Sequence, residues 1–411
     1  MNTILNPICA MGRADTFAGS LFVLANGIFA TAPSTECKTK ALTFMNNEPL
    51  GFQVSRNNAL KRITAQLPAL RKALLSDQLL ESAALAAVKM PIVLDVGAAA
   101  FGPPEYYTGS DSLLVLKVSD VAVSVHAFEM QHSIADQLQK EAMLALKFAA
   151  PGSTHEVHRI GVGAKQSELL ASPMEGTDKV QTLTLTGGSG QSKRNNVFRT
   201  RVTSLDWWES EHSFNRSILY IKVDTNGHEP AVLQGLTRLM SVRPPLFLSF
   251  EYSFGWSTLF SNITIKLMRK KARQVSAKDG TLMERNLVFK QDPATVVGGA
   301  MLRDFVANLS AAHYAVYLTH ERGLVRVDGT WWQSSYELEL NERVKSPAPQ
   351  ESWDLIAAYR GSPQRALERL FLFAPLPCLT VPGMPNNCKE QPPLAEALMP
   401  ECASALMAGV S

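Results

Sequence analysis

Two apolar segments with closely matching ends constrain the fold of this chain most. The first is IVLDVGAAAFG at Ile92–Gly102 and the second is LYIKVDTNGHEPAVLQG at Leu219–Gly235. Each apolar run ends in an aspartate that is followed by a glycine-containing turn. Such runs are typical of parallel strands buried on both faces, whose carboxyl ends open onto a ligand crevice. The pair therefore predicts an α/β fold with a ligand site where these strands end.

A third apolar run, Val123–Met130, lies between the two and also ends in an acid, Glu129. Asp95 can accept hydrogen bonds from a cationic group or pair with it, and Gly97 leaves room for the backbone to approach a ligand. Glu129 follows that glycine by about thirty residues, where an acid at the end of the second strand can bind both ribose hydroxyls. Acids at successive strand ends therefore indicate a nucleoside ligand.

Two common nucleotide motifs do not fit these residues. Gly97 is followed by three alanines, a phenylalanine and Gly102, which breaks the G-x-G-x-x-G fingerprint of dinucleotide enzymes. The glycine-rich stretch GGSGQSK at 187–193 lacks the Gly-Lys-Ser/Thr ending of a phosphate-binding loop, and its composition predicts a flexible loop. An NAD-dependent oxidoreductase is therefore the weaker interpretation.

Five short motifs occur in a fixed order along the chain. They are DVGAA at Asp95, AFEM at Ala127, TSLDWW at Thr203, IKVDTNGHE at Ile221 and PPLFLSFEY at Pro244. In this order the chain resembles the FkbM-type family of S-adenosylmethionine-dependent methyltransferases, over roughly Ile92–Tyr252 and more loosely to about Leu372. The resemblance implies an α/β fold with a Rossmann-like, seven-stranded class I methyltransferase sheet, whose final hairpin contains one antiparallel strand.

The resemblance also implies roles for particular residues. The residues expected to bind S-adenosyl-L-methionine are Asp95, Gly97, Ala98 and Glu129, and those expected on the side of the methyl acceptor are Asp224, His228, Glu229 and Glu251. The expected acceptor is a sugar or another small-molecule or glycan hydroxyl. An imidazole is a suitable base for its proton, and Asp224 or Glu229 can orient that base. Lys222 is expected to pair structurally with an acid.

Four departures from the family pattern fall in the predicted pocket. Ala99 stands where the family has asparagine, and the following glycine is displaced to Gly102. Met130 replaces proline and Asn226 replaces an acid. A catalytically inactive binding module with the same fold therefore remains the alternative. No metal is expected, because Asp224, Glu229 and Glu251 lack a diagnostic spacing for a divalent ion.

The amino terminus has the character of an export signal or short anchor. Phe17–Ala32 is almost uncharged, Arg13 lies upstream, and Ala30-Thr31-Ala32 forms a small-residue pattern. We therefore expect entry into the secretory pathway, or membrane association through this leader only. Cys9 precedes the apolar segment Phe17–Ala32 and four cysteines follow it, and disulfides and free thiols both remain open. The net charge of +3 is too small to argue for a nucleic-acid partner.

The expected organisation is a leader at 1–38, a helical region at 39–89, a methyltransferase domain at 90–375 with an insertion near 254–300, and a Pro-rich tail at 376–411. The expected strands are Ile92–Asp95, Val121–Glu129, His155–Ala164 with a turn, Ile218–Asp224, Leu246–Glu251, Tyr314–Thr319 and Trp353–Tyr359. SELLAS and VQTLTLT are expected to pair as strands, and helices are expected within Leu60–Val88, Ser133–Phe148 and Leu302–Ala312.

Overall fold

The computed structural model describes residues 36–37, 59–77, 82–98, 110–173, 180–183, 198–212, 218–225, 228–253, 302–320, 323–332 and 352–371. The predicted leader before residue 36, the insertion near 254–300 and the Pro-rich tail lie outside these residues. So do Ala99 and Asn226.

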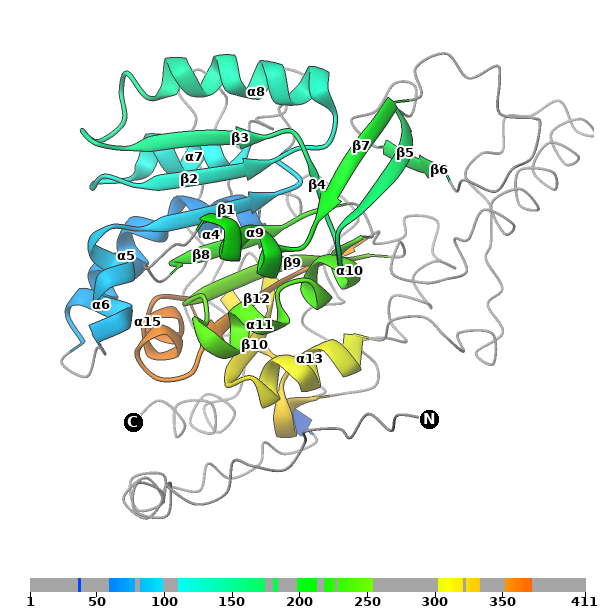
Figure 1. Cartoon of the computed structure of the whole chain (residues 1–411). Coiled ribbons are helices and arrows are strands. Elements are labelled where there is room, and N and C mark those ends of the chain that lie inside the picture. The colour runs from blue at the N-terminus through cyan, green and yellow to red at the C-terminus, as the bar shows by residue number, and fades with distance from the viewer. Residues whose placement is uncertain are drawn as a thin grey trace, which may run out of the picture.

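A mixed sheet with parallel strands at its centre forms the middle of the molecule (Figure 1). Its order is β11-β10-β12-β9-β8-β1-β2-β3. The strands are β1 (Ile92–Val96), β2 (Ser124–Phe128), β3 (Thr154–His158), β8 (Tyr220–Val223), β9 (Phe247–Ser253), β10 (Tyr314–His320), β11 (Gly323–Arg326) and β12 (Ser352–Tyr359). The five strands from β3 to β9 run parallel, whereas β12 is antiparallel to both of its neighbours.

The strand order reverses between β1 and β8. The chain places β2 and β3 on one side of β1 and then returns to place β8 and β9 on the other side. Ligands of open α/β sheets bind at such a switch point, beyond the carboxyl ends of the strands. The apolar runs ending at Asp95 and Asp224 are thus adjacent strands, as the sequence predicts.

Among the described residues, the main sheet has eight strands rather than the expected seven. The additional strand is β11, which returns from β10 as an antiparallel hairpin, with His320 opposite Gly323. Gly323 has φ +142°, a backbone conformation that favours glycine at this tight return. Apart from the expected strand at His155–Ala164, the expected strands within the described residues are confirmed, including the antiparallel pairing of β5 (Ser167–Pro173) with β6 (Val180–Leu183).

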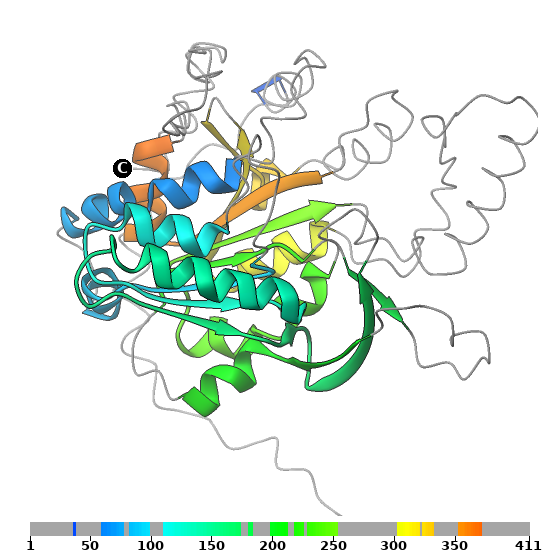
Figure 2. The same cartoon turned by 90° about the horizontal axis from the view of Figure 1, so that it is seen from above.

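Helices cover both faces of the main sheet (Figure 2). One face packs on α4 (Ala59–Ala65), α5 (Leu67–Leu75), α6 (Ser82–Lys89), α7 (Asp111–Val118), α8 (His132–Ala145) and α15 (Ser362–Phe371). The other packs on α9 (Leu205–His212), α10 (Glu229–Gln234), α11 (Thr237–Val242) and α13 (Leu302–Ala311). Alternate residues of β1 reach the two cores, with Val93 in the first and Leu94 in the second. This alternation follows from the two-residue repeat of a strand.

A smaller sheet projects beside the main one in the order β4-β7-β5-β6 (Figure 1). It contains β4 (Gly161–Val162) and β7 (Phe198–Thr203) together with the paired strands β5 and β6. The expected strand at His155–Ala164 is therefore two strands, because β3 stays in the main sheet and β4 enters the small one.

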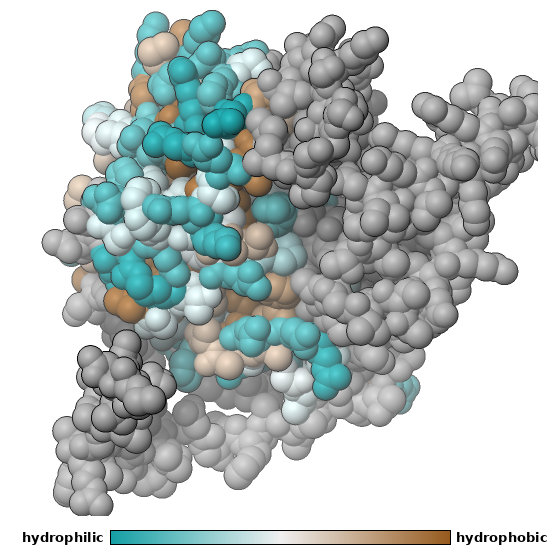
Figure 3. Space-filling model, turned by 45° about the vertical axis from the view of Figure 1, so that its right-hand side comes forward, coloured by the Kyte–Doolittle hydropathy of each residue, from teal (hydrophilic) through white to brown (hydrophobic). Residues whose placement is uncertain are grey.

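Three further features concern the surface, Cys37 and the length of the described helices. On the face seen in Figure 3, hydrophilic and intermediate side chains are interspersed with smaller hydrophobic groups. Cys37 is buried and disulfide-bonded, so a disulfide forms where the sequence left thiols and disulfides open. Within the described residues, the helices are all too short or too polar to cross a bilayer.

Candidate active site

A buried lysine surrounded by three aspartates lies at the switch point. Asp95 and Lys222 are opposite each other in the β1–β8 register, so their side chains lie on the same face. Lys222 Nζ is 3.5 Å from Asp95 Oδ1, 3.0 Å from Asp111 Oδ2 and 3.2 Å from Asp224 Oδ2. The expected pairing of Lys222 with an acid is confirmed, and it involves three acids.

The first turn of α7 completes this cluster. Asp95 Oδ2 accepts hydrogen bonds from Ser110 Oγ at 2.8 Å and from Ser112 N at 2.9 Å. Ser110 is the N-cap of α7, and Asp111 is the first residue of that helix. Sequence reasoning missed Asp111. A serine followed by an acid and an apolar run, as in SDSLLVL, is the N-cap signal that identifies such a helix start.

The charges of this cluster determine its protonation. Burial alone would lower the pKa of Lys222, but Asp95, Asp224 and Asp111 outweigh it and hold that pKa well above 10.5. Burial raises the pKa of Asp111, although Lys222 acts in the opposite direction. Burial also lowers the pKa of Lys61, a neighbouring residue of α4. Lys222 is therefore a fixed positive charge between β1, α7 and the end of β8.

The turn after β1 requires glycine for a reason that differs from the predicted one. Gly97 has φ +78°, and a Cβ at this position would lie 1.8 Å from the carbonyl oxygen of Asp224. The glycine thus permits close contact between the ends of β1 and β8, whereas the sequence suggested room for a ligand. The N–H groups of Gly97 and Ala98 both donate to Phe128 O, at 3.0 and 3.1 Å. Ala98 itself is buried in the core.

Glu129 is held directly beside this turn. Its own N–H donates to His158 O at 3.0 Å, and its Oε1 accepts from Gln131 N at 2.7 Å. Because Phe128 O receives the two N–H groups of the β1 turn, the carboxyl ends of β1 and β2 are joined. The structure therefore brings Asp95 and Glu129 to neighbouring strand ends, as the sequence predicts.

Three of the four residues predicted on the acceptor side also meet. Asp224 after β8, Glu229 at the start of α10 and Glu251 in β9 each present a carboxylate oxygen, and these oxygens lie within 4.8 Å of one another. Glu229 is fully buried, and its Oε1 accepts from Thr225 N at 2.7 Å. Asp224 connects this acidic group to the lysine cluster through its ion pair with Lys222.

The fourth predicted residue, His228, lies slightly apart. It is the N-cap of α10, and its Nε2 lies 3.9 Å from where a Cβ of Gly163 would be. Among the described residues it is not a member of the carboxylate group. Its side chain is exposed, yet loss of hydration in its crowded surroundings lowers its pKa below 6.5. This shift favours the neutral form of the His228 imidazole.

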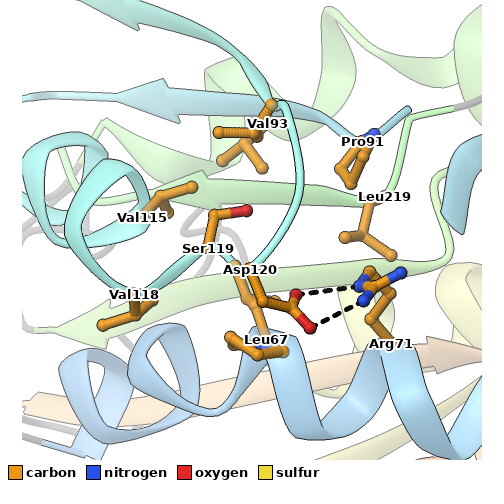
Figure 4. A pocket seen from close by; sticks show the side chains of 11 residues that line it. Leu67, Arg71, Pro91, Val93, Val115, Val118, Ser119, Asp120 and Leu219 are labelled. Atoms are coloured by element: carbon orange, nitrogen blue, oxygen red, sulfur yellow. Dashed lines mark hydrogen bonds and ion pairs between the residues drawn. The ribbon is translucent and has the colours of Figure 1, made fainter. Parts of the chain in front are cut away.

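A small pocket lies at the other end of the strands (Figure 4). It is lined by Pro91, Val93 and Leu219, near the amino ends of β1 and β8, and by residues of α5 and α7. Arg71 donates two hydrogen bonds to Asp120 at its rim, 3.1 and 2.7 Å long. Since ligands of α/β sheets bind at the carboxyl ends, this pocket is not the switch-point site.

Comparisons with known proteins add little to this geometry. No family model and no curated protein sequence matches the chain. Among solved structures, the chain is similar to the methyltransferase domain of bacterial CtHen1-C, with a TM-score of 0.29 and 9% identity over 72% of this chain and 100% of that one. A likeness of this size carries no argument about fold or activity.

Proposed function

We propose that this protein is an S-adenosylmethionine-dependent methyltransferase that methylates a hydroxyl of a sugar, glycan or other small molecule. The observation that carries the proposal is the position of the acids. Asp95 lies near the carboxyl end of β1, and Glu129 and Asp224 directly follow β2 and β8, the two neighbours of β1 in the sheet. Antiparallel β12 between β9 and β10 agrees with the sheet that the FkbM-type motifs imply.

The residues at the strand ends fit the two polar parts of the methyl donor. Glu129 is a buried carboxylate beside the β1 turn, which suits hydrogen bonds from the two ribose hydroxyls. Asp95 is 1% exposed and already accepts bonds from α7, so we assign it to positioning the turn and Lys222. Gly97 and Ala98 contribute the backbone of that turn. S-adenosylmethionine supplies an electrophilic methyl group when it is bound.

The carboxylates of Asp224, Glu229 and Glu251 form the proposed acceptor side. Carboxylate oxygens accept hydrogen bonds from hydroxyl groups, which fits a sugar-like acceptor better than an anionic one. His228, whose lowered pKa favours the neutral imidazole, is the proposed base for the acceptor proton. For location, we propose the secretory pathway, with any membrane association through the leader. The disulfide at Cys37 supports an oxidising compartment.

Calorimetric binding of S-adenosylmethionine to the full chain tests the proposal first. We expect micromolar binding by the parent protein and at least tenfold weaker binding by Glu129→Gln, a loss of about 1.4 kcal/mol or more. Glu168→Gln is the matched control, because Glu168 is an exposed residue of the small sheet. A folded parent that binds no S-adenosylmethionine would instead favour an inactive binding module.

Asp224→Asn then separates cofactor binding from turnover. We expect this variant to bind S-adenosylmethionine like the parent and to lose methyl transfer in an acceptor screen, since its carboxylate is assigned to the acceptor. Equal turnover by the variant and the parent would remove Asp224 from the proposed acceptor side.

A further inference from the structure

A cluster of histidines lies on the opposite face of the sheet from Lys222. His126 of β2 and His158 of β3 stack with ring centroids 5.4 Å apart and planes 20° from parallel. Trp208 of α9 makes T-shaped contacts with both rings, with its ring centroid 5.1 and 5.2 Å from theirs. Glu156 stands opposite His126 in the parallel β2–β3 register, so its side chain projects from the same face.

We propose that His126, His158 and Glu156 form a binding site for a divalent transition metal, with Zn²⁺ as the fitting ion. One ligand atom from each residue lies within 4.8 Å of the others. His126 Nδ1 is 3.2 Å from His158 Nε2 and 3.5 Å from Glu156 Oε2. Zn–N bonds of about 2.0–2.1 Å at a tetrahedral angle place two ligand atoms roughly 3.3 Å apart. The two observed separations lie on either side of that value.

Neighbouring hydroxyl groups orient the first ligand. His126 Nε2 is 3.2 Å from Ser124 Oγ, which in turn accepts from Thr154 Oγ1 at 3.1 Å. With the Thr154 hydroxyl donating to it, Ser124 Oγ is available to accept the His126 Nε2 proton. That tautomer leaves a lone pair on His126 Nδ1, directed at His158 Nε2 and Glu156. Metal-binding histidines are typically oriented in this way by a hydrogen bond at the other ring nitrogen.

The cluster combines a buried pair of ligands with an open side. The side chains of His126 and His158 are 7% and 10% exposed, whereas that of Glu156 is 59% exposed. An ion can therefore enter past Glu156, and a water molecule can fill a fourth coordination position there. Two neutral imidazoles and one carboxylate are ligands that suit zinc better than magnesium or calcium, which prefer oxygen.

A bound ion would join the edge strand β3 to its neighbour β2. Without metal, the two imidazoles form one N–H···N hydrogen bond. Metal binding would replace this hydrogen bond, so the affinity for the metal can be measured by titration. The proposal does not depend on methyl transfer, because none of its ligands is assigned to the methyl donor or the acceptor.

Metal titration of the full chain tests this site. The tag-free protein is treated with a chelator, its fold is checked by circular dichroism, and Zn²⁺ is titrated against a chromophoric competitor. Co²⁺ is then added, because four-coordinate Co²⁺ gives strong visible absorption. We expect one Zn²⁺ per chain at this site and a four-coordinate Co²⁺ spectrum, neither of them displaced by excess Mg²⁺.

Two variants and one control locate the bound ion. Glu156→Gln changes an exposed side chain and leaves the buried rings in place, and His126→Asn removes a buried ligand. His132→Asn changes an exposed histidine of α8 outside the cluster. We expect Zn²⁺ affinity to fall at least tenfold in the first two variants and to stay unchanged in the control. A folded parent that retains no Zn²⁺, or equal affinity of Glu156→Gln and His132→Asn, overturns the proposal.

Discussion

At the scale of single residues, Lys222 determines the charge balance beneath the candidate site. Its side chain is 7% exposed, and the three aspartates around it belong to the ends of β1 and β8 and to the start of α7. Removal of one partner from a buried ion pair leaves the remaining charges without compensation, which costs more than the pair itself contributes. Lys222 is thus required as the shared counter-charge of these three acidic side chains.

Replacement of this lysine by methionine tests that requirement. We expect Lys222→Met to lower the free energy of unfolding by about 3–5 kcal/mol at pH 7, measured by urea denaturation. Burial already raises the pKa of Asp111, and loss of Lys222 raises it further. A carboxyl whose pKa is higher in the folded state than in the unfolded state destabilises the fold above its folded pKa. The loss of unfolding free energy in Lys222→Met should therefore shrink as the pH falls from 7 to 5. Lys89→Met, at an exposed position in α6, is the control. A deficit that does not change with pH would contradict this account.

At the scale of elements, the turn after β1 holds three strand ends together. Gly97 lies against the carbonyl of Asp224 after β8, and its N–H donates to Phe128 at the end of β2. A side chain at position 97 must therefore displace one of the two neighbouring strands.

Two glycine substitutions separate this packing from backbone strain. In Gly97→Ala, a residue with positive φ gains a Cβ that would lie 1.8 Å from the carbonyl oxygen of Asp224. In Gly329→Ala, the residue has φ +57° but no atom lies within 4 Å of the added Cβ. We expect Gly329→Ala to cost about 1–2 kcal/mol from its backbone conformation alone. Gly97→Ala should cost at least about 2 kcal/mol more and should also weaken binding of S-adenosylmethionine. Equal unfolding free energies of the two variants would show that the strand ends shift at little cost.

Local patterns predicted the central elements, whereas contacts distant in sequence were not predictable. The strands ending at Asp95, Glu129 and Asp224 were evident because continuous apolar runs precede the acids. Asp111 was missed because its role depends on the approach of α7 to Lys222, which no spacing encodes. The cluster of His126 and His158 was missed for a similar reason. Their proximity depends on the register of β2 and β3, 32 residues apart in the chain.

At the scale of the whole molecule, α5, near the start of the described main domain, and α15, its last described helix, lie side by side. Arg365 of α15 donates two hydrogen bonds to Asp77 just after α5, at 3.1 and 2.9 Å. Leu367 and Phe371 share a hydrophobic core with Ile63 and Leu70. The same core includes residues from β1, β2, β8 and β10, so helices from both ends of the described domain complete one face of the sheet.

A double-mutant cycle measures the coupling energy of the Asp77–Arg365 contact between α5 and α15. Asp77 and Arg365 are 10% and 29% exposed, so we expect a coupling energy of about 1–2 kcal/mol between Asp77→Asn and Arg365→Gln. The control pair, Arg199 and Glu168, is 70% and 57% exposed at 3.3 Å and should give less than about 0.5 kcal/mol. Equal coupling in the two cycles would mean that the helix contact gains nothing from partial burial.

The contact between α5 and α15 also sets an order of events during protein synthesis. Asp77 and Arg365 are 288 residues apart, and a ribosome adding 5–20 residues per second needs roughly 15 to 60 s to translate that distance. During this interval the apolar sides of α4 and α5 have been made but their last partner has not. The nascent chain therefore carries an incomplete core until α15 leaves the ribosome, and we expect chaperones to bind the amino-terminal helices during that interval.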